Sequence, residues 1–170
     1  MKLNKFLLAV SLSVGVLAGL WQVLVQLYPT IVSSFPLAGV GVAGFLGWAT
    51  FYAAGGKKEG FLKGTAANLT GILWGVVIVV IWNLFNFNNL GAFIAVGIGA
   101  GMMCFQAHIK ALSFIPGAFI GASTFFALGA TITGAVLWPA AIGLVLGLAA
   151  GWLSETVAIF LNGKFEGSKK

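Results

Sequence analysis

The chain has 170 residues, of which 60% are hydrophobic and 7% are charged, with nine lysines, three glutamates, no aspartate and no arginine. A soluble domain typically carries about 25% charged residues, so this composition excludes a water-soluble globular fold. The formal net charge of +6 does not indicate a nucleic-acid partner, because the lysines are scattered between apolar runs instead of forming a patch. We therefore expect an integral membrane protein whose main partner is the lipid bilayer.

Six apolar runs follow one another along the chain, each close to the roughly 20 residues that cross a bilayer as a helix. They cover residues 6–28, 35–55, 64–85, 90–107, 112–129 and 134–153. Polar residues separate them, including a turn at residues 29–34. The first run is longer than the usual apolar region of a signal peptide, so we expect a retained span, with a cleaved signal as the alternative. The polar tail, residues 154–170, leaves room for the last helix to continue beyond the membrane surface.

The positions of the lysines predict the topology, because cytoplasmic segments carry the excess of basic residues. With six spans, all of the lysines fall in the two termini and in the second and fourth connections: Lys2, Lys5, Lys57, Lys58, Lys63, Lys110, Lys164, Lys169 and Lys170. The first, third and fifth connections carry no charge. The sequence therefore predicts a multi-pass protein of the bacterial inner membrane with both termini in the cytoplasm.

Three pairs of similar segments suggest an internal repeat. Residues 45–55 match residues 119–129 at six of eleven positions. Residues 14–19 resemble residues 96–101. A weaker match joins Thr70-Gly71 to Thr133-Gly134. The alternative is that helices rich in glycine, alanine and phenylalanine simply look alike.

The order of these matches predicts two halves of three spans each, residues 1–85 and 90–153. Three spans are an odd number, so the second half must enter the membrane from the opposite side. The predicted fold class is thus an all-α membrane protein, one integral membrane domain over residues 1–170, with six transmembrane helices arranged as two inverted three-helix repeats.

A family resemblance rests on the stretch Gly-Trp-Ala-Thr-Phe-Tyr-Ala-Ala-Gly-Gly at residues 47–56, with the short lysine-bearing loop and the hydropathy of the whole chain. These features resemble a family of small six-span bacterial inner-membrane proteins known only as a domain of unknown function. The resemblance implies a location and no activity. The inverted layout is similar to that of aquaporins and formate/nitrite channels, although the chain lacks paired Asn-Pro-Ala motifs, and the likeness transfers no substrate.

Candidate pathway residues come from two patterns. Glycines four residues apart let helices approach closely, and those near the middle of the first and fourth spans predict a crossing at the midplane: Gly15, Gly19, Gly97 and Gly101. Uncharged polar residues inside spans either line a pathway or join helices: Thr50, Thr124, Asn68 and Gln106. Packing is the alternative for the glycines, and a hydrogen bond to the residue's own helix is the alternative for the threonines.

Two further features concern gating and assembly. His108 lies near the cytoplasmic end of the fourth span, where a group that titrates near neutral pH is a candidate gate; an interfacial role is the alternative. Gly143, Gly147 and Gly151 form one stripe on the sixth span. This stripe predicts the contact face of a homo-oligomer, unless it packs within its own helix bundle.

The predicted function is a channel or facilitative transporter for a small uncharged or weakly polar solute, because the spans carry no carboxylate that would couple transport to an ion. A noncatalytic scaffold or accessory subunit of a membrane complex is the alternative. We expect neither an enzyme nor a cofactor or metal site, since the chain has a single histidine and a single cysteine, Cys104.

Overall fold

The computed structural model describes residues 4–31 and 37–167, and this part of the chain is helical throughout apart from its connections. Its six α-helices are α1 (Lys5–Ile31), α2 (Val40–Ala53), α3 (Lys57–Leu84), α4 (Asn89–Phe105), α5 (Ile115–Ala127) and α6 (Gly134–Gly167). Two short 3₁₀ turns, η1 (Gln106–His108) and η2 (Lys110–Leu112), join α4 to α5. The prediction of an all-α fold is confirmed. Residues 29–31 of the predicted turn belong to α1, so the first helix was predicted to end too early, and residues 32–34 lie outside the described residues, as do Lys2, Lys169 and Lys170.

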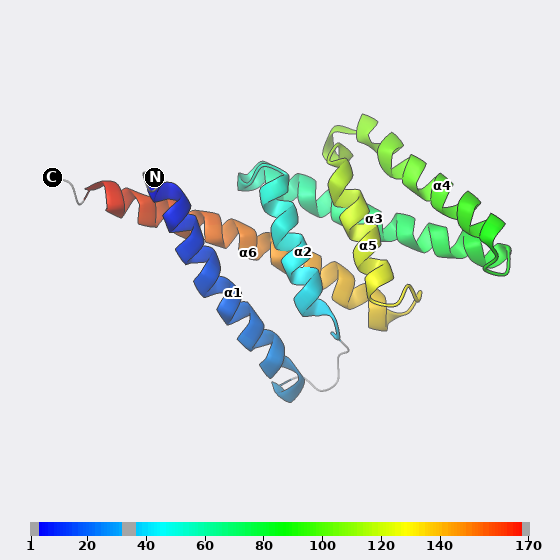
Figure 1. Cartoon of the computed structure of the whole chain (residues 1–170), viewed down its shortest axis with the longest axis horizontal. Coiled ribbons are helices and arrows are strands. Elements are labelled where there is room, and N and C mark those ends of the chain that lie inside the picture. Colours follow the sequence, from blue (N-terminus) through cyan, green and yellow to red (C-terminus); the bar gives the residue numbers. More distant parts are fainter. Residues whose placement is uncertain (1–3, 32–36, 168–170) are drawn as a thin grey trace.

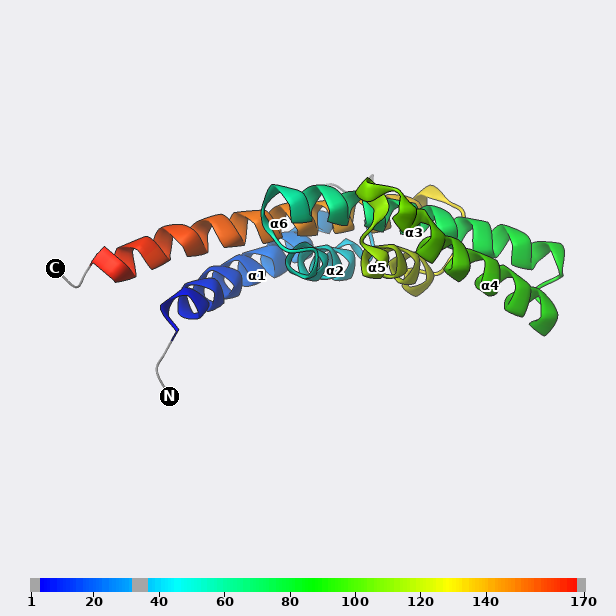
Figure 2. The same cartoon turned by 90° about the horizontal axis from the view of Figure 1, so that it is seen from above.

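The helices form a flat molecule of two layers (Figures 1 and 2). Helices α3 and α6 make one layer, and α1, α2, α5 and α4 lie side by side in the other (Figure 2). Helix α2 packs mainly on α6, whereas α5 packs mainly on α3. Several helices run in opposite directions: α1 runs opposite to α4, α2 opposite to α5 and α3 opposite to α6 (Figure 1).

Four of these helices are long and apolar enough to cross a bilayer: residues 5–28, 57–84, 89–108 and 134–165. Helices α2 and α5 are apolar but have only 14 and 13 residues, about 20 Å of helix against a hydrocarbon core of about 30 Å. The second and fifth spans were therefore predicted too long. Helix α2 begins only after Gly39, whose φ of 89° is left-handed and interrupts the helical backbone.

Helices α2 and α5 end in the same way, which explains the most similar segment of the chain. Gly55 and Gly129 both adopt a positive φ, 99° and 113° respectively. The amides around each glycine bond back to the last turn, as in a Schellman motif: Gly55 N donates to Tyr52 O and Gly56 N to Phe51 O, while Gly129 N donates to Phe126 O and Ala130 N to Phe125 O. A left-handed residue is needed at this position, so glycine recurs there.

The α2–α6 interface is built on the three glycines of α6. A methyl group at Gly147 would overlap the carbonyl oxygen of Gly44, and one at Gly143 or Gly151 would press on Ala43 or on the Phe51 ring. The stripe is therefore buried against α2 of the same chain. The hypothesis that it forms the face of a homo-oligomer is wrong for this face, because no surface of these glycines is left for a second copy.

The α3–α5 interface also depends on glycines that lie directly against a backbone carbonyl. A methyl group at Gly71 would overlap the carbonyl oxygen of Ala118, and one at Gly121 would overlap that of Asn68. Gly71 thus occupies the position at α3 that Gly147 occupies at α6. Gly134, which the weaker sequence match paired with Gly71, instead lies beside Trp138 at the start of α6.

Helices α1 and α4 lie at opposite ends of the molecule (Figure 1), so the predicted midplane crossing of the first and fourth spans is wrong. Helix α1 packs on α6, and α4 packs on α3. The glycines that predicted the crossing have open space beside them, with no atom within 4 Å of an added methyl group: Gly15, Gly19, Gly97 and Gly101. Their spacing resembles that of the buried glycines, but they face outward.

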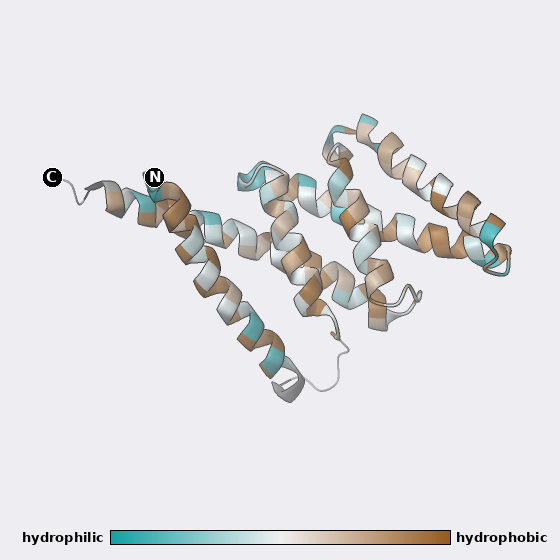
Figure 3. Cartoon of the chain, viewed as in Figure 1, coloured by the Kyte–Doolittle hydropathy of each residue, from teal (hydrophilic) through white to brown (hydrophobic). Residues whose placement is uncertain are grey.

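Hydrophobic residues run along most of the helices, and hydrophilic residues gather mainly towards their ends (Figure 3). On α1 the exposed side chains include Leu12, Val16 and Leu20, and on α4 they include Phe93 and Ile98. A soluble protein rarely exposes such a continuous apolar surface. In a bilayer, acyl chains cover it.

Candidate functional site

A polar centre lies inside the molecule where α2, α3 and α5 meet. Asn68 is fully buried on α3, and its backbone carbonyl contacts Gly121 of α5. Thr50 Oγ1, on α2, donates to Leu46 O at 2.9 Å and lies 3.3 Å from Asn68 Oδ1. Asn68 Nδ2 has no hydrogen-bond partner within the described residues. The structure therefore brings together the side chains of two of the candidate pathway residues, Asn68 and Thr50.

Thr124 occupies the corresponding place on α5. It is buried, and its hydroxyl donates to Ile120 O at 2.7 Å, one turn earlier in the same helix. This bond is the self-contained arrangement expected for an intramembrane threonine. Thr124 therefore needs no other partner, whereas the free amide nitrogen of Asn68 does.

Gln106 is buried at the end of α4. Its Oε1 accepts a hydrogen bond of 2.9 Å from Trp74 Nε1 on α3, and its Nε2 has no partner within the described part of the chain. The bond joins the end of α4 to α3. Gln106 is thus separate from the Asn68 centre, and the structure does not bring these two predicted pathway residues into one site.

A second polar group, which sequence analysis missed, joins α1, α2 and α6. Ser154 Oγ accepts from Trp48 Nε1 at 3.0 Å, lies 2.8 Å from Tyr52 OH and donates to Gly151 O at 2.7 Å. Ser13 Oγ donates to Ser154 O at 2.9 Å. We call these residues, Ser13, Trp48, Tyr52 and Ser154, the serine hub. Sequence analysis placed Ser154 in the polar tail and so did not connect it with the aromatic residues of the second span.

An apolar pocket of about 310 Å³ lies between α3, α4 and α5. Phe119, Ala122, Ser123 and Phe126 of α5 form one wall, and Ile78 of α3 contributes to another. Helix α4 closes the remaining side with Val96, Ala100 and Met103. Neither Asn68 nor Gln106 lines this pocket.

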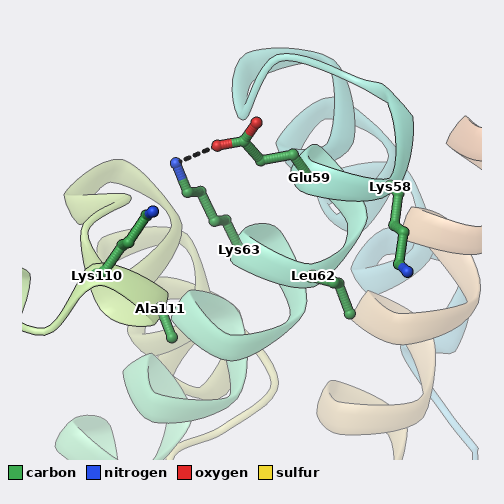
Figure 4. Close-up of a pocket in the computed structure, with 6 residues that line it drawn as sticks. All are labelled: Lys58, Glu59, Leu62, Lys63, Lys110 and Ala111. Atoms are coloured by element: carbon green, nitrogen blue, oxygen red, sulfur yellow. Dashed lines mark ion pairs between the residues drawn. The ribbon is translucent and has the colours of Figure 1, made fainter.

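A basic pocket lies at the start of α3 (Figure 4). It has a volume of about 650 Å³ and is lined by Lys58, Glu59, Leu62, Lys63, Lys110 and Ala111, which we call the lysine pocket. Lys63 Nζ and Glu59 Oε1 form an ion pair of 2.6 Å. Lys110 comes from η2 and lies on the same side as Lys63, whereas Lys58 projects from the other side of the first turn of α3 (Figure 4). Two lysine-bearing connections that are far apart in sequence thus meet.

Charged side chains outside the lysine pocket, including Glu155 and Lys5, support helix ends. Glu155 Oε2, on α6, accepts a hydrogen bond of 2.7 Å from the backbone N–H of Lys57 and so caps α3 from outside. Lys5 Nζ donates to Phe165 O at 2.5 Å and ties α1 to α6. His108 is exposed, its Nδ1 is 2.7 Å from Phe105 O, and its ring packs against the Phe105 ring. These contacts place His108 at the surface, away from the polar centre.

Together, the four long apolar helices, the apolar outer surface and the uncharged interior define an all-helical integral membrane protein. The chain belongs to the family described as a protein of unknown function (DUF1097), whose family model matches residues 11–159. This confirms the resemblance found in the sequence.

Relatives of this chain occur in enteric bacteria. It is 36% identical over 155 residues to the uncharacterized protein YahC of Escherichia coli strain K12, with 88% of each chain covered. It is 34% identical over 147 residues to the inner membrane protein YcdZ of the same organism, covering 84% of this chain and 82% of YcdZ. YcdZ of Salmonella typhimurium is also 34% identical, over 145 residues and 84% of each chain. No solved structure matches. The protein is therefore a bacterial inner membrane protein.

Proposed function

We propose that this protein is a channel or facilitative transporter for a small uncharged or weakly polar solute, built from two inverted three-helix repeats with both termini in the cytoplasm. Four observations support the proposal: the paired helix interfaces, the edge at which the lysine-bearing segments meet, the uncharged interior, and the free amide of Asn68. The last of these carries it.

The two glycine interfaces support the inverted repeat. At α2–α6 the contacts are Gly47 with Leu144 O and Gly147 with Gly44 O; at α3–α5 they are Gly121 with Asn68 O and Gly71 with Ala118 O. The sequence match that aligns Phe45 with Phe119 also aligns Gly47 with Gly121 and Gly44 with Ala118. Exchanging the first half for the second therefore maps each of these interfaces onto the other. The opposed helix directions in Figure 1 fit a twofold axis in the membrane plane.

The arrangement of the connections supports the topology. The start of α1, the end of α6 and the α2–α3 and α4–α5 connections lie along the upper edge in Figure 1, whereas the α3–α4 and α5–α6 connections lie at the right-hand and lower edges. The lysines of the described residues belong to the upper set. A cytoplasmic surface at this edge satisfies the positive-inside rule.

The interior supports an uncharged solute. The buried polar residues of the described chain are Ser13, Thr50, Asn68, Gln106, Thr124 and Ser154, none of which carries a charge. Proton- and ion-coupled carriers usually place ionisable groups within the membrane. Amide and hydroxyl groups suit a solute that exchanges hydrogen bonds with water.

Asn68 Nδ2 is an unused hydrogen-bond donor in this interior, as Gln106 Nε2 is at the end of α4. An unpartnered amide in an apolar interior costs about 1–3 kcal/mol, and intramembrane polar groups without a structural partner commonly mark a substrate pathway. Its place between α2, α3 and α5 is also where the two proposed repeats meet. We therefore assign the solute contact to Asn68 Nδ2, with Thr50 beside it.

The test is solute flux through vesicles containing the purified protein, measured by light scattering after an osmotic step with glycerol, urea or another small neutral solute. Asn68→Leu should abolish protein-dependent flux while keeping the fold, because Leu144 occupies the equivalent position at the α2–α6 interface. Thr70→Val is the matched control, since the Thr70 hydroxyl bonds only to the Ala66 and Ala67 carbonyls of its own helix. Equal flux in wild type and Asn68→Leu would refute the assignment.

The alternative function, a noncatalytic scaffold of a membrane complex, is favoured by α1. Only Ala9 and Ser13 of its described side chains are buried, and Gly15 and Gly19 leave a face that a partner helix could approach closely. A folded protein that gives no flux with any neutral solute would support the scaffold. A homo-oligomer remains a prediction, and its contact face is no longer the glycine stripe of α6.

A further inference from the structure

We propose that the lysine pocket binds the anionic headgroup of an acidic phospholipid. The pocket brings three lysines, Lys58, Lys63 and Lys110, together with one glutamate, Glu59, which leaves two positive charges in excess. Its only carboxylate is already engaged by Lys63 at 2.6 Å. Within the described residues, Lys58 and Lys110 have no carboxylate within ion-pair distance. Lys110 therefore lines the pocket from η2 beside Lys63, and Lys58 lines it from α3 with its ammonium group on the other side of the first turn (Figure 4).

The rest of the pocket is suited to lipid instead of a free anion. Leu62 and Ala111 contribute an apolar floor beneath the lysines, and the Leu62 side chain is 54% exposed. A small hydrated anion would gain nothing from such a floor, whereas the glycerol backbone and the first methylenes of a phospholipid would bury apolar surface there. Basic pockets at the ends of transmembrane helices are known to take anionic headgroups.

A path for the acyl chain continues from this floor. Leu62, Leu69 and Leu73 lie on one face of α3, because seven and eleven residues each correspond to nearly whole numbers of helical turns. Leu69 and Leu73 line an apolar pocket of about 440 Å³ whose other wall is α6, with Leu137 and Trp138. The distance along α3 from Leu62 to Leu73 is about 16 Å. A headgroup at the lysine pocket can thus extend its chain along α3 to this second pocket.

The experiment titrates delipidated protein in a neutral detergent with dioleoyl phosphatidylglycerol or dioleoyl phosphatidylcholine, and native mass spectrometry counts the bound lipids. We expect the wild type to prefer phosphatidylglycerol. The double variant Lys58→Gln/Lys110→Gln should bind it about 30-fold more weakly, the loss expected when two surface lysines that line the pocket are removed from an anionic headgroup. The matched control, Lys57→Gln/Lys164→Gln, removes the same charge outside the pocket and should change the affinity little. All four side chains lie at the surface, so both variants should remain folded.

Three results would overturn the proposal. An equal loss in both double variants would mean a diffuse attraction to the positive surface. Equal binding of the two lipids would mean that the headgroup charge is not recognised. Finally, if inorganic phosphate bound the wild type without lipid, lost its binding in Lys58→Gln/Lys110→Gln and displaced phosphatidylglycerol, the site would be one for a free anion. Reduced lipid binding in Leu62→Asn with both lysines intact would support the phospholipid.

Discussion

Replacing Gly147 by alanine tests whether backbone contact at the glycine stripe holds α2 and α6 together. The structure leaves no room for the added methyl group, because it would overlap the carbonyl oxygen of Gly44 and crowd the backbone nitrogen of Trp48. Neither of these atoms belongs to a flexible side chain. The two helices must therefore move apart along the most extensive interface in the molecule. Gly19→Ala is the control, because an added methyl group there meets no atom within 4 Å.

The two substitutions, Gly19→Ala and Gly147→Ala, should change the free energy of unfolding in opposite directions. In an exposed helix, alanine is more stable than glycine by about 1 kcal/mol, so Gly19→Ala should leave stability unchanged or raise it slightly. Overpacking a close interface costs about 1–3 kcal/mol, and more when only backbone can yield. After the gain in helix propensity is included, Gly147→Ala should still be less stable than Gly19→Ala by roughly 2 kcal/mol. Gly71→Ala should behave like Gly147→Ala, since it meets Ala118 O in the same way.

The assay is equilibrium unfolding of the purified variants in mixed micelles, followed by tryptophan fluorescence. Particle mass in the same samples shows whether assembly changes. Loss of stability without a change in mass would agree with an internal interface. If Gly147→Ala were as stable as Gly19→Ala, or if it changed only the mass, the close α2–α6 contact would be wrong.

Three further predictions concern the topology, the cap of α3 and the packing of Trp48. On a Cys104→Ala background, cysteines introduced by Asn88→Cys and Lys58→Cys should react with an impermeant reagent from opposite sides of the membrane, and labelling from one side would contradict the proposed topology. Glu155→Ala should lower the free energy of unfolding by about 1 kcal/mol, because it removes the acceptor that caps α3, whereas a variant as stable as the wild type would show the cap to be dispensable. Trp48→Ala should lower it by about 3–5 kcal/mol, because it empties a buried site and breaks the bond to Ser154, and a loss below 1 kcal/mol would contradict the packing of the serine hub.

The helix count could be predicted from sequence because it depends on apolar length, but the partner of each helix could not. Gly15 and Gly19 repeat at the same spacing as Gly143 and Gly147, and both pairs sit among apolar residues. Only the second pair meets another backbone. Lipid and a neighbouring helix are both apolar environments, so the hydrophobic pattern that marks the buried face of a soluble helix is weak here. The predicted crossing of the first and fourth spans was wrong for this reason.

Polar residues were better guides than glycines. An amide inside an apolar run is costly unless it pairs or faces a cavity, and this reasoning singled out Asn68 and Gln106, both of which are buried. It could not predict that they belong to different sites. The serine hub was missed because Ser154 was counted with the polar tail, whereas α6 continues as helix to Gly167.

The proposed repeat also locates where the two halves differ. Aligning Phe45 with Phe119 places Trp48 opposite Ala122, so the first half has an indole where the second has a methyl group. In the first half the Trp48 ring stacks on Phe45, with ring centres 6.3 Å apart, and bonds to Ser154. The first half is therefore filled and hydrogen-bonded at this position.

The second half keeps the aromatic walls without the indole. Phe119 and Phe126, which align with Phe45 and Tyr52, line the apolar pocket of about 310 Å³ together with Ala122. The glycine contacts beneath the two positions are nevertheless the same, since Gly47 and Gly121 each meet a backbone carbonyl of the opposing helix. If the repeat served only to hold the fold together, an indole in one half and a pocket in the other would have no purpose, since the backbone contacts are the same in both. A functional difference between the two halves should therefore be sought at the side chains around Ala122.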